Sequence, residues 1–145
     1  MSQPSITVVV GDWTRLRDDA GAVRHAVFVL EQNVPPEIEM DEYDAVCVHA
    51  VAYDADGAAL GTGRLLPDGH IGRMAVHRRA RGLGVGARLL QALVEAARAG
   101  GHRRLMLNAQ THARGFYEGQ GFVVEGDEFM EAGIPHVAMA RTLSA

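Results

Sequence analysis

The stretch "IGRMAVHRRARGLGVGARLLQALVEAA" (residues 71–97) runs from a strand pattern through a basic, glycine-rich turn into a helix pattern. From Gly84 to Ala99 the polar side chains fall in one narrow arc at about 100° per residue, and apolar side chains fill the opposite side. Gly100 and Gly101 follow, as glycines commonly do where a helix ends. We therefore expect a strand over residues 69–76, a turn, and an amphipathic helix over residues 84–99.

The turn, Arg78 to Gly86, resembles phosphate-binding loops in composition. The spacing of its glycines shows which of the known types of loop it can be. A P-loop needs Lys and then Ser or Thr after its last glycine, whereas Ala87 and Arg88 follow Gly86. A dinucleotide-binding turn needs G-x-G-x-x-G and an acid at the end of the next strand. Here the spacing is G-x-G-x-G and the next strand ends at Asn108. The spacing excludes the P-loop and weakens the dinucleotide interpretation.

The pattern that remains is R-x-x-G-x-G, from Arg81 to Gly86. Glycine lets backbone N–H groups approach a ligand without a Cβ in the way. The first turn of a helix leaves N–H donors free, its dipole favours an anion, and arginine adds charge-assisted hydrogen bonds. These properties suit a pyrophosphate cradle, while a flexible basic turn without a ligand is the alternative that the spacing leaves open.

Length and composition limit the class of protein that this chain can be. A chain of 145 residues is expected to form one domain, residues 1–145, with a sizeable core. The net charge of -4 argues against bulk nucleic-acid binding. One cysteine excludes an internal disulfide and a cysteine-based metal cluster. No apolar run is long enough to cross a membrane, and the N-terminus has no export pattern, so a cytoplasmic protein is expected.

The remaining patterns predict the order β-α-β-β-β-α-β-α-β-β. The expected strands are residues 5–11, 45–54, 58–66, 69–76, 103–108, 121–126 and 136–143. The expected helices are residues 12–32, residues 84–99 and a short helix with Thr111 as its N-cap, and the expected loops are residues 33–44 and 127–135. This order predicts a mixed sheet with helices on its faces, in an α/β or α+β sandwich.

The opening stretch resembles the acetyl-CoA-binding core of the GNAT family of N-acetyltransferases. The family's R/Q-x-x-G-x-G/A motif is present at Arg81, Gly84 and Gly86, and "LMLNAQTHARGFYEGQGF" (residues 105–122) is similar to the family's next strand and helix. The flanks, including "VRHAVFVLEQNVPPEIEMDEYDAVCVHAVA" (residues 23–52), resemble the subfamily typified by ElaA and YjcF. The resemblance implies a mostly antiparallel central sheet of about seven strands flanked by helices.

The resemblance also implies a site for acetyl-CoA as the acetyl donor. The backbone of Met74, Ala75 and Val76 would pair with the pantetheine arm, and Asn108 would contact it from the other side. The pyrophosphate would be held by the motif and its neighbours, which are Arg81, Gly82, Leu83, Gly84, Val85, Gly86 and Ala87. Tyr117 matches the family's general acid and would also touch the cofactor; a core tyrosine is the alternative.

The proton acceptor and the acceptor pocket are less sharply defined by the sequence. Glu31, at the end of the first helix, is the expected base, and Glu131 or His136 could also accept the proton, directly or through water. The alternatives are a solvated helix end for Glu31 and a hydrogen-bonded strand histidine for His136. Glu131 and His136 flank a late loop and are expected, with Glu31 and Arg73, to contact the acceptor. His49 is expected to be a structural, hydrogen-bonded histidine.

Cys47 is expected to lie in the core. The acids between Glu37 and Asp44 form either a solvated loop or an electronegative rim that attracts a cationic amine. Arg64 or Arg73, if it faced the pocket, would favour an acceptor that also carries a carboxylate or phosphate.

The function expected from the sequence is direct transfer of an acetyl group from acetyl-CoA to a primary amine of a small molecule or peptide. A non-catalytic acyl-CoA-binding or sensor module on the same fold is one alternative, and a dinucleotide-binding protein that takes NAD is another. No metal, nucleic acid or membrane partner is expected, and a homodimer is compatible with the family.

Overall fold

Two antiparallel sheets form the framework of the protein in the computed structural model, which describes residues 5–143. In the first sheet the strands follow chain order: β1 (Thr7–Gly11), β2 (Val48–Tyr53), β3 (Ala59–Leu65) and β4 (Ile71–Val76). In the second, β8 (Ile134–Thr142) pairs with β5 (Arg104–Gln110), β6 (Val123–Val124) and β7 (Phe129–Glu131). The predicted mostly antiparallel strand arrangement flanked by helices is confirmed, but residues 5–143 contain eight strands in two sheets in place of about seven in one.

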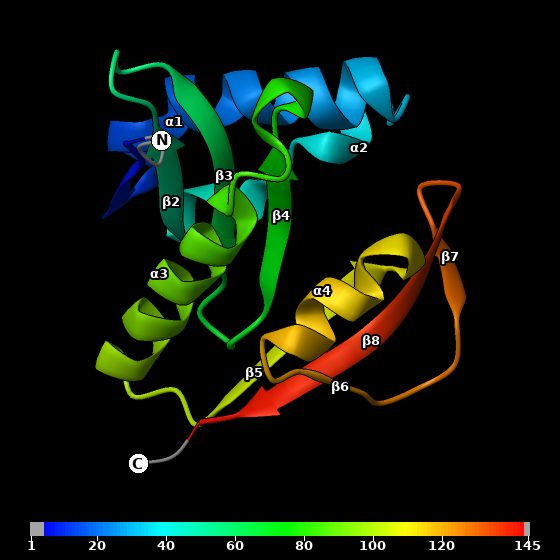
Figure 1. Ribbon diagram of the computed structural model, residues 1–145. Coiled ribbons are helices and arrows are strands. Elements are labelled where there is room, and N and C mark those ends of the chain that lie inside the picture. The colour runs from blue at the N-terminus through cyan, green and yellow to red at the C-terminus, as the bar shows by residue number, and fades with distance from the viewer. Residues whose placement is uncertain (1–4, 144–145) are drawn as a thin grey trace.

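The helices lie over the faces of these sheets (Figure 1). The main helices are α1 (Trp13–Arg24), which continues into the π-helical turn η1 (His25–Glu31), α3 (Val85–Ala99) and α4 (Arg114–Gly119). The short ones are α2 (Pro36–Glu39) and the 3-10 turns η2 (Glu42–Val46), η3 (Arg78–Ala80) and η4 (Thr111–Ala113).

The alternation of side chains along β2 places α1 and α3 on opposite faces of the first sheet. Val51 packs with Leu16 and Ala20 of α1, whereas Ala50 and Ala52 belong to the large core cluster that contains the apolar side of α3. That cluster continues across the second sheet to Phe122 and Met139, so one hydrophobic core joins the two sheets.

The two sheets meet where β4 and β5 begin to diverge. His70 and Met106 form an isolated parallel bridge, and the Met106 N–H donates to the carbonyl of Gly69 at 3.1 Å. Beyond that bridge, in the described residues, β4 pairs only with β3 and β5 only with β8. The two strands therefore form the sides of a V that opens toward η1, α2 and the β7–β8 hairpin (Figure 1).

An irregularity in β4 lies beside this opening. Thr62 pairs with Ala75 and Arg64 pairs with Gly72, so β4 contains one residue more than β3 between these pairs. Arg73 lies in this bulge with φ of +49°, in the left-handed region that residues other than glycine rarely adopt. The bulge fixes the direction of the last residues of β4, Met74 to Val76.

Several expected boundaries are wrong. Residues 33–44 contain α2 and part of η2, because Pro36 sits at the first helical position, where it needs no N–H acceptor. The expected loop 127–135 contains β7 and the start of β8, and the strand expected over 121–126 is reduced to β6. Thr111 does not cap α4, whose N-cap is Ala113 without a side-chain bond. The helix expected over 12–32 is continuous through Gly21 but changes to π geometry at His25.

Within residues 5–143 no helix has both the length and the apolar character needed to cross a membrane.

Candidate active site

The glycine-rich turn presents free backbone N–H groups at the start of α3. Gly82 and Gly84 have φ of +82° and +81°, and a Cβ on either would meet nothing within 4 Å, so the surface above them is open. The first backbone bond of the helix runs from the Arg88 N–H to the Gly84 carbonyl at 3.1 Å. The N–H groups of Val85–Ala87 therefore have no acceptor within the helix and can bind an anion.

The side chain of Arg81 is bound to Glu31 at the end of η1. Its Nη1 and Nη2 donate to the two carboxylate oxygens at 2.6 and 2.7 Å, and its Nε donates to the Val76 carbonyl at 3.1 Å. The hydrogen bond from Arg81 lowers the pKa of the Glu31 carboxyl, and Arg78 lies 3.6 Å from the same carboxylate. In this arrangement Glu31 links η1 to the end of β4 and is a weak proton acceptor.

Polar side chains gather on one face of the β5–β8 pair near the open end of the V. Gln110 lies directly opposite His136 and Asn108 opposite Ala138, so these four side chains share a face. Asn108 is exposed and His136 is buried.

His136 lies between a backbone carbonyl and Glu131. Its Nδ1 is 2.7 Å from the Ile134 carbonyl oxygen, which can only accept, so Nδ1 carries the proton in the neutral ring. Its Nε2 lies 3.5 Å from the Glu131 carboxylate, and Phe129 stacks on the ring with centroids 5.9 Å apart. The structure thus brings two predicted acceptor-site residues together and leaves the Nε2 lone pair of the neutral ring free to take a proton.

Tyr117 projects from α4 into the core. The side chain is 9% exposed and packs against Phe116 and Phe122, with ring centroids 5.0 and 6.1 Å away. Burial raises the pKa of Tyr117 to about 12. The phenol is therefore protonated at neutral pH and can donate a proton.

Three of the acids in residues 37–44 belong neither to a solvated loop nor to an electronegative rim, the two alternatives that the sequence left open. Asp41 and the buried Glu39 and Asp44 pair with arginines instead. Arg24 reaches Glu39 at 2.5 Å and Asp44 at 2.7 Å. Hence both the solvated-loop and the electronegative-rim interpretations are wrong for these three acids.

Arg64 and Arg73 complete this ionic cluster. Arg64 donates to Asp41 at 2.7 Å and to Asp44 at 2.8 Å, and Arg73 donates to the Glu39 carbonyl at 3.1 Å and to Asp41 at 3.3 Å. Both guanidinium groups are thus paired within the protein, and the assignment of Arg73 to the acceptor stays a prediction.

His49 and Cys47 lie in the interior, as expected. The His49 ring is 1% exposed, and its Nε2 is 2.9 Å from the Asp44 carbonyl oxygen. Burial lowers the pKa of His49 and raises the pKa of the Cys47 thiol to about 11, so both groups are uncharged at neutral pH.

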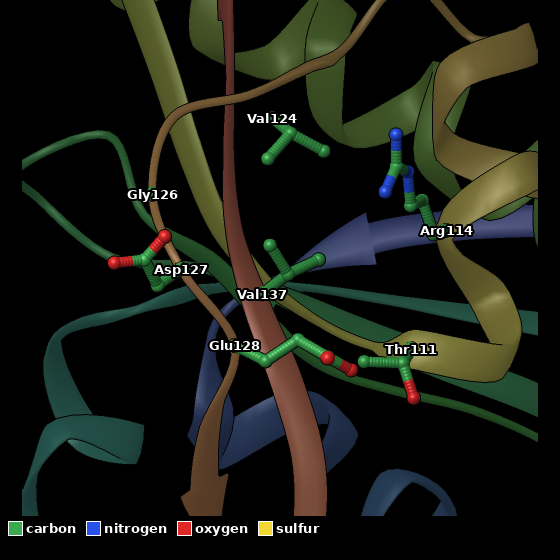
Figure 2. Close-up of a pocket in the computed structure, with 7 residues that line it drawn as sticks. All are labelled: Thr111, Arg114, Val124, Gly126, Asp127, Glu128 and Val137. Atoms are coloured by element: carbon green, nitrogen blue, oxygen red, sulfur yellow. The ribbon is translucent and has the colours of Figure 1, made fainter.

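A hollow of about 360 Å³ lies between the start of α4, β8 and the segment that joins β6 to β7 (Figure 2). Its lining residues are Thr111, Arg114, Val124, Gly126, Asp127, Glu128 and Val137. Val137 follows His136 in β8, and adjacent strand residues point to opposite faces. The hollow is therefore on the other side of β8 from His136 and Gln110.

Comparison with known proteins assigns the family. A family model described as an acetyltransferase (GNAT) domain matches residues 18–143. An uncharacterized N-acetyltransferase, YjcF of Bacillus subtilis, is 43% identical over 127 residues, covering 85% of this chain and 90% of that protein. The chain belongs to the GNAT acetyltransferase family.

Solved structures of the GNAT family agree with this assignment. An acyl-CoA N-acyltransferase from Pseudomonas aeruginosa superposes with a TM-score of 0.84 at 32% identity, over 95% of this chain and all of that one. Escherichia coli ElaA superposes with a TM-score of 0.83 at 27% identity, over 94% of this chain and 99% of that one. This GNAT protein is accordingly an acyltransferase enzyme with the ElaA-like arrangement of the fold.

Two glutamines of this GNAT chain were missed by the sequence analysis. Gln110 Nε2 donates to Gln32 Oε1 at 2.9 Å, and Gln32 Nε2 lies 3.4 Å from Gln110 Oε1. His112 Nε2 is 2.6 Å from the same Gln110 oxygen. No spacing rule connects residues 78 positions apart, so only the folded chain reveals this contact.

Proposed function

We propose that the protein transfers the acetyl group of acetyl-CoA to a primary amine. The observation that carries the proposal is the open cradle of unpaired N–H groups at the start of α3, which Arg81 ties to the end of β4. The same geometry fits the diphosphate of coenzyme A, because the cradle has room above Gly82 and Gly84 and its helix dipole favours an anion. The relative from Pseudomonas aeruginosa, an acyl-CoA N-acyltransferase, supports the same class of donor.

The donor arm is proposed to lie along β4. The backbone of Met74, Ala75 and Val76 would bind pantetheine as a further strand would, and Asn108 would contact it from β5. Arg81 would act through its charge and its bond to the Val76 carbonyl, since its guanidinium fork is held by Glu31. When bound, acetyl-CoA supplies the thioester carbonyl that the amine attacks.

Two protons must then move as the C–N bond forms and the C–S bond breaks. Tyr117 would give its phenolic proton to the departing thiolate, because burial raises the pKa of Tyr117 to about 12 and so keeps the phenol protonated until the C–S bond breaks. His136 is better suited than Glu31 to take the proton of the amine, because the pKa of Glu31 is lowered by Arg81. Glu131, 3.5 Å from Nε2, would stabilise the imidazolium that results.

The proposal is tested by following thiol release from acetyl-CoA with a panel of primary amines, beside calorimetric binding of CoA. We expect turnover with at least one amine, and Tyr117→Phe should bind CoA with unchanged affinity while its kcat falls at least a hundredfold. Binding of CoA without turnover of any amine would favour the non-catalytic alternative. Binding of NAD but not of CoA would restore the dinucleotide interpretation.

A further inference from the structure

We infer that the acceptor amine is recognised through a neutral amide group, which Gln32 and Gln110 bind at the open end of the V. The inference rests on the proposed function and specifies the acceptor class for the same site. The glutamines lie on opposite sides of the opening. Gln32 follows η1, which belongs to the helical layer of the first sheet, and Gln110 ends β5 of the second sheet (Figure 1).

The backbone around Gln32 directs this side chain into the opening. In η1 the Gln32 N–H bonds to the Val27 carbonyl at 3.0 Å, five residues back, and the Val34 N–H bonds to the Phe28 carbonyl at 2.8 Å. Asn33 takes φ of +60° between them. Irregular π-turns of this kind occur often at functional sites. Here the irregular turn sends Glu31 toward Arg81 and Gln32 toward Gln110.

The pairing of the charged side chains around the opening is an independent reason to expect an acceptor that binds through a neutral group. Glu31 is neutralised by Arg81, and Asp41 by Arg64 and Arg73, so these groups hold no unpaired charge for an acceptor. Other polar groups on this side include the two carboxamides, Asn108, His112, His136 and the half-exposed Glu131. Glu131 suits the ammonium form of the reacting amine, which leaves the carboxamides to bind the rest of the acceptor.

The hydrogen bonds between the two glutamines show which chemical group of an acceptor could bind to both in their place. Each carboxamide offers one donor and one acceptor to the other, and both side chains are only partly buried. An acceptor with a carboxamide or peptide bond presents the same donor and acceptor pattern, so it can insert between the glutamines without leaving a polar group unpaired. A carboxylate cannot donate, and an ammonium cannot accept, so each would satisfy the pair only in part.

The test compares kcat/KM for four acceptors of similar size, with rates expressed per concentration of free base: glycinamide, glycine, ethylenediamine and propylamine. We expect glycinamide to be preferred over each of the others by about tenfold, the effect of two hydrogen bonds to neutral groups. Glycylglycinamide extends the panel. A higher kcat/KM than that of glycinamide assigns the amide to a peptide, and a lower one assigns it to a small molecule.

Gln32→Met and Gln110→Met remove the carboxamides at nearly constant volume. Each should lower kcat/KM for glycinamide about threefold, which is its share of the tenfold preference, through KM, and leave propylamine unchanged. Gln91→Met, on the exposed side of α3, is the matched control and should change neither. Turnover of the panel with no amide preference in the wild-type chain, or equal loss for both acceptors in the variants, overturns the inference alone. If no amine is acetylated although CoA binds, the proposed function is wrong and the inference falls with it.

Discussion

Arg24 should be the arginine whose loss destabilises the protein most. Its guanidinium is 1% exposed, donates to Glu39 at 2.5 Å and to Asp44 at 2.7 and 3.1 Å, and lies 5.3 Å from the centre of the Trp13 ring. In Arg24→Met the aliphatic volume is kept and the charge is lost. Asp44 retains Arg64 at 2.8 Å, but the Glu39 carboxylate, 4% exposed, loses its only salt-bridge partner among residues 5–143.

The expected loss follows from that unpaired charge. Removing one partner of a buried ion pair costs about 3–5 kcal/mol, a large part of the roughly 5–15 kcal/mol that stabilises a typical domain. At about 2–4 °C per kcal/mol, the midpoint of thermal unfolding should fall by roughly 6–20 °C. Urea unfolding followed by far-UV circular dichroism measures the free energy directly.

A surface variant and a double variant complete this experiment. Arg79→Met is the control, because Arg79 is exposed and its nearest carboxylate, Asp54, is 3.9 Å away; its unfolding free energy should change by less than about 0.5 kcal/mol. Adding Glu39→Gln to Arg24→Met removes the unpaired charge and should recover part of the loss. If the unfolding free energy of Arg24→Met falls by less than about 1 kcal/mol, the reasoning that Arg24, Glu39 and Asp44 form a buried ion cluster without water is refuted.

Three further outcomes are expected. Because burial raises the pKa of Tyr117 to about 12, loss of the phenolic proton should not lower kcat below about pH 10. Any alkaline decline of kcat below that pH should therefore also be present in Tyr117→Phe. Hydrogen bonding from Arg64 lowers the pKa of Asp41 in the folded chain, so this stabilisation is fully present above about pH 4 and is lost as the pH falls further. Asp41→Asn should therefore flatten the acid limb of urea unfolding below about pH 4 and leave its slope unchanged above that pH. Gly84→Ala forces a left-handed alanine and should cost about 1–2 kcal/mol in thermal unfolding, whereas Gly86→Ala, whose Cβ would meet Phe116 at an ordinary 3.6 Å, should cost nothing measurable.

Features set by local sequence were predicted well. The helix α3 and the glycine turn before it depend on side-chain periodicity and on glycines that lie within about twenty residues of one another. The β7–β8 hairpin was missed because its turn is Ala132-Gly133, with φ of +52° and +76°. Alanine is a poor residue for that geometry, so the usual asparagine–glycine signal of a two-residue turn is absent.

Features set by tertiary contact could not be predicted. The acids near Pro35 and Pro36 have the composition of a solvated loop, and only the position of Arg24 on α1, together with Arg64 on β3, shows that the acids are buried and paired. Glu31 was expected to be a base because it ends the first helix next to the acceptor site. Its ion pair with Arg81, fifty positions away, could not be inferred from either local pattern.

The irregular end of the first helix links the two halves of the proposed site. Glu31 and Gln32 are adjacent, yet one binds Arg81 beside the donor cradle and the other binds Gln110 at the acceptor side. Neighbouring side chains at a helix end point about 100° apart, so Glu31 and Gln32 can reach different sides of the opening from adjacent positions. The helix ends there in a π-turn that is followed by the left-handed Asn33. One short segment thus fixes two positions: that of the arginine that precedes the cradle, and that of the amide that would bind the acceptor.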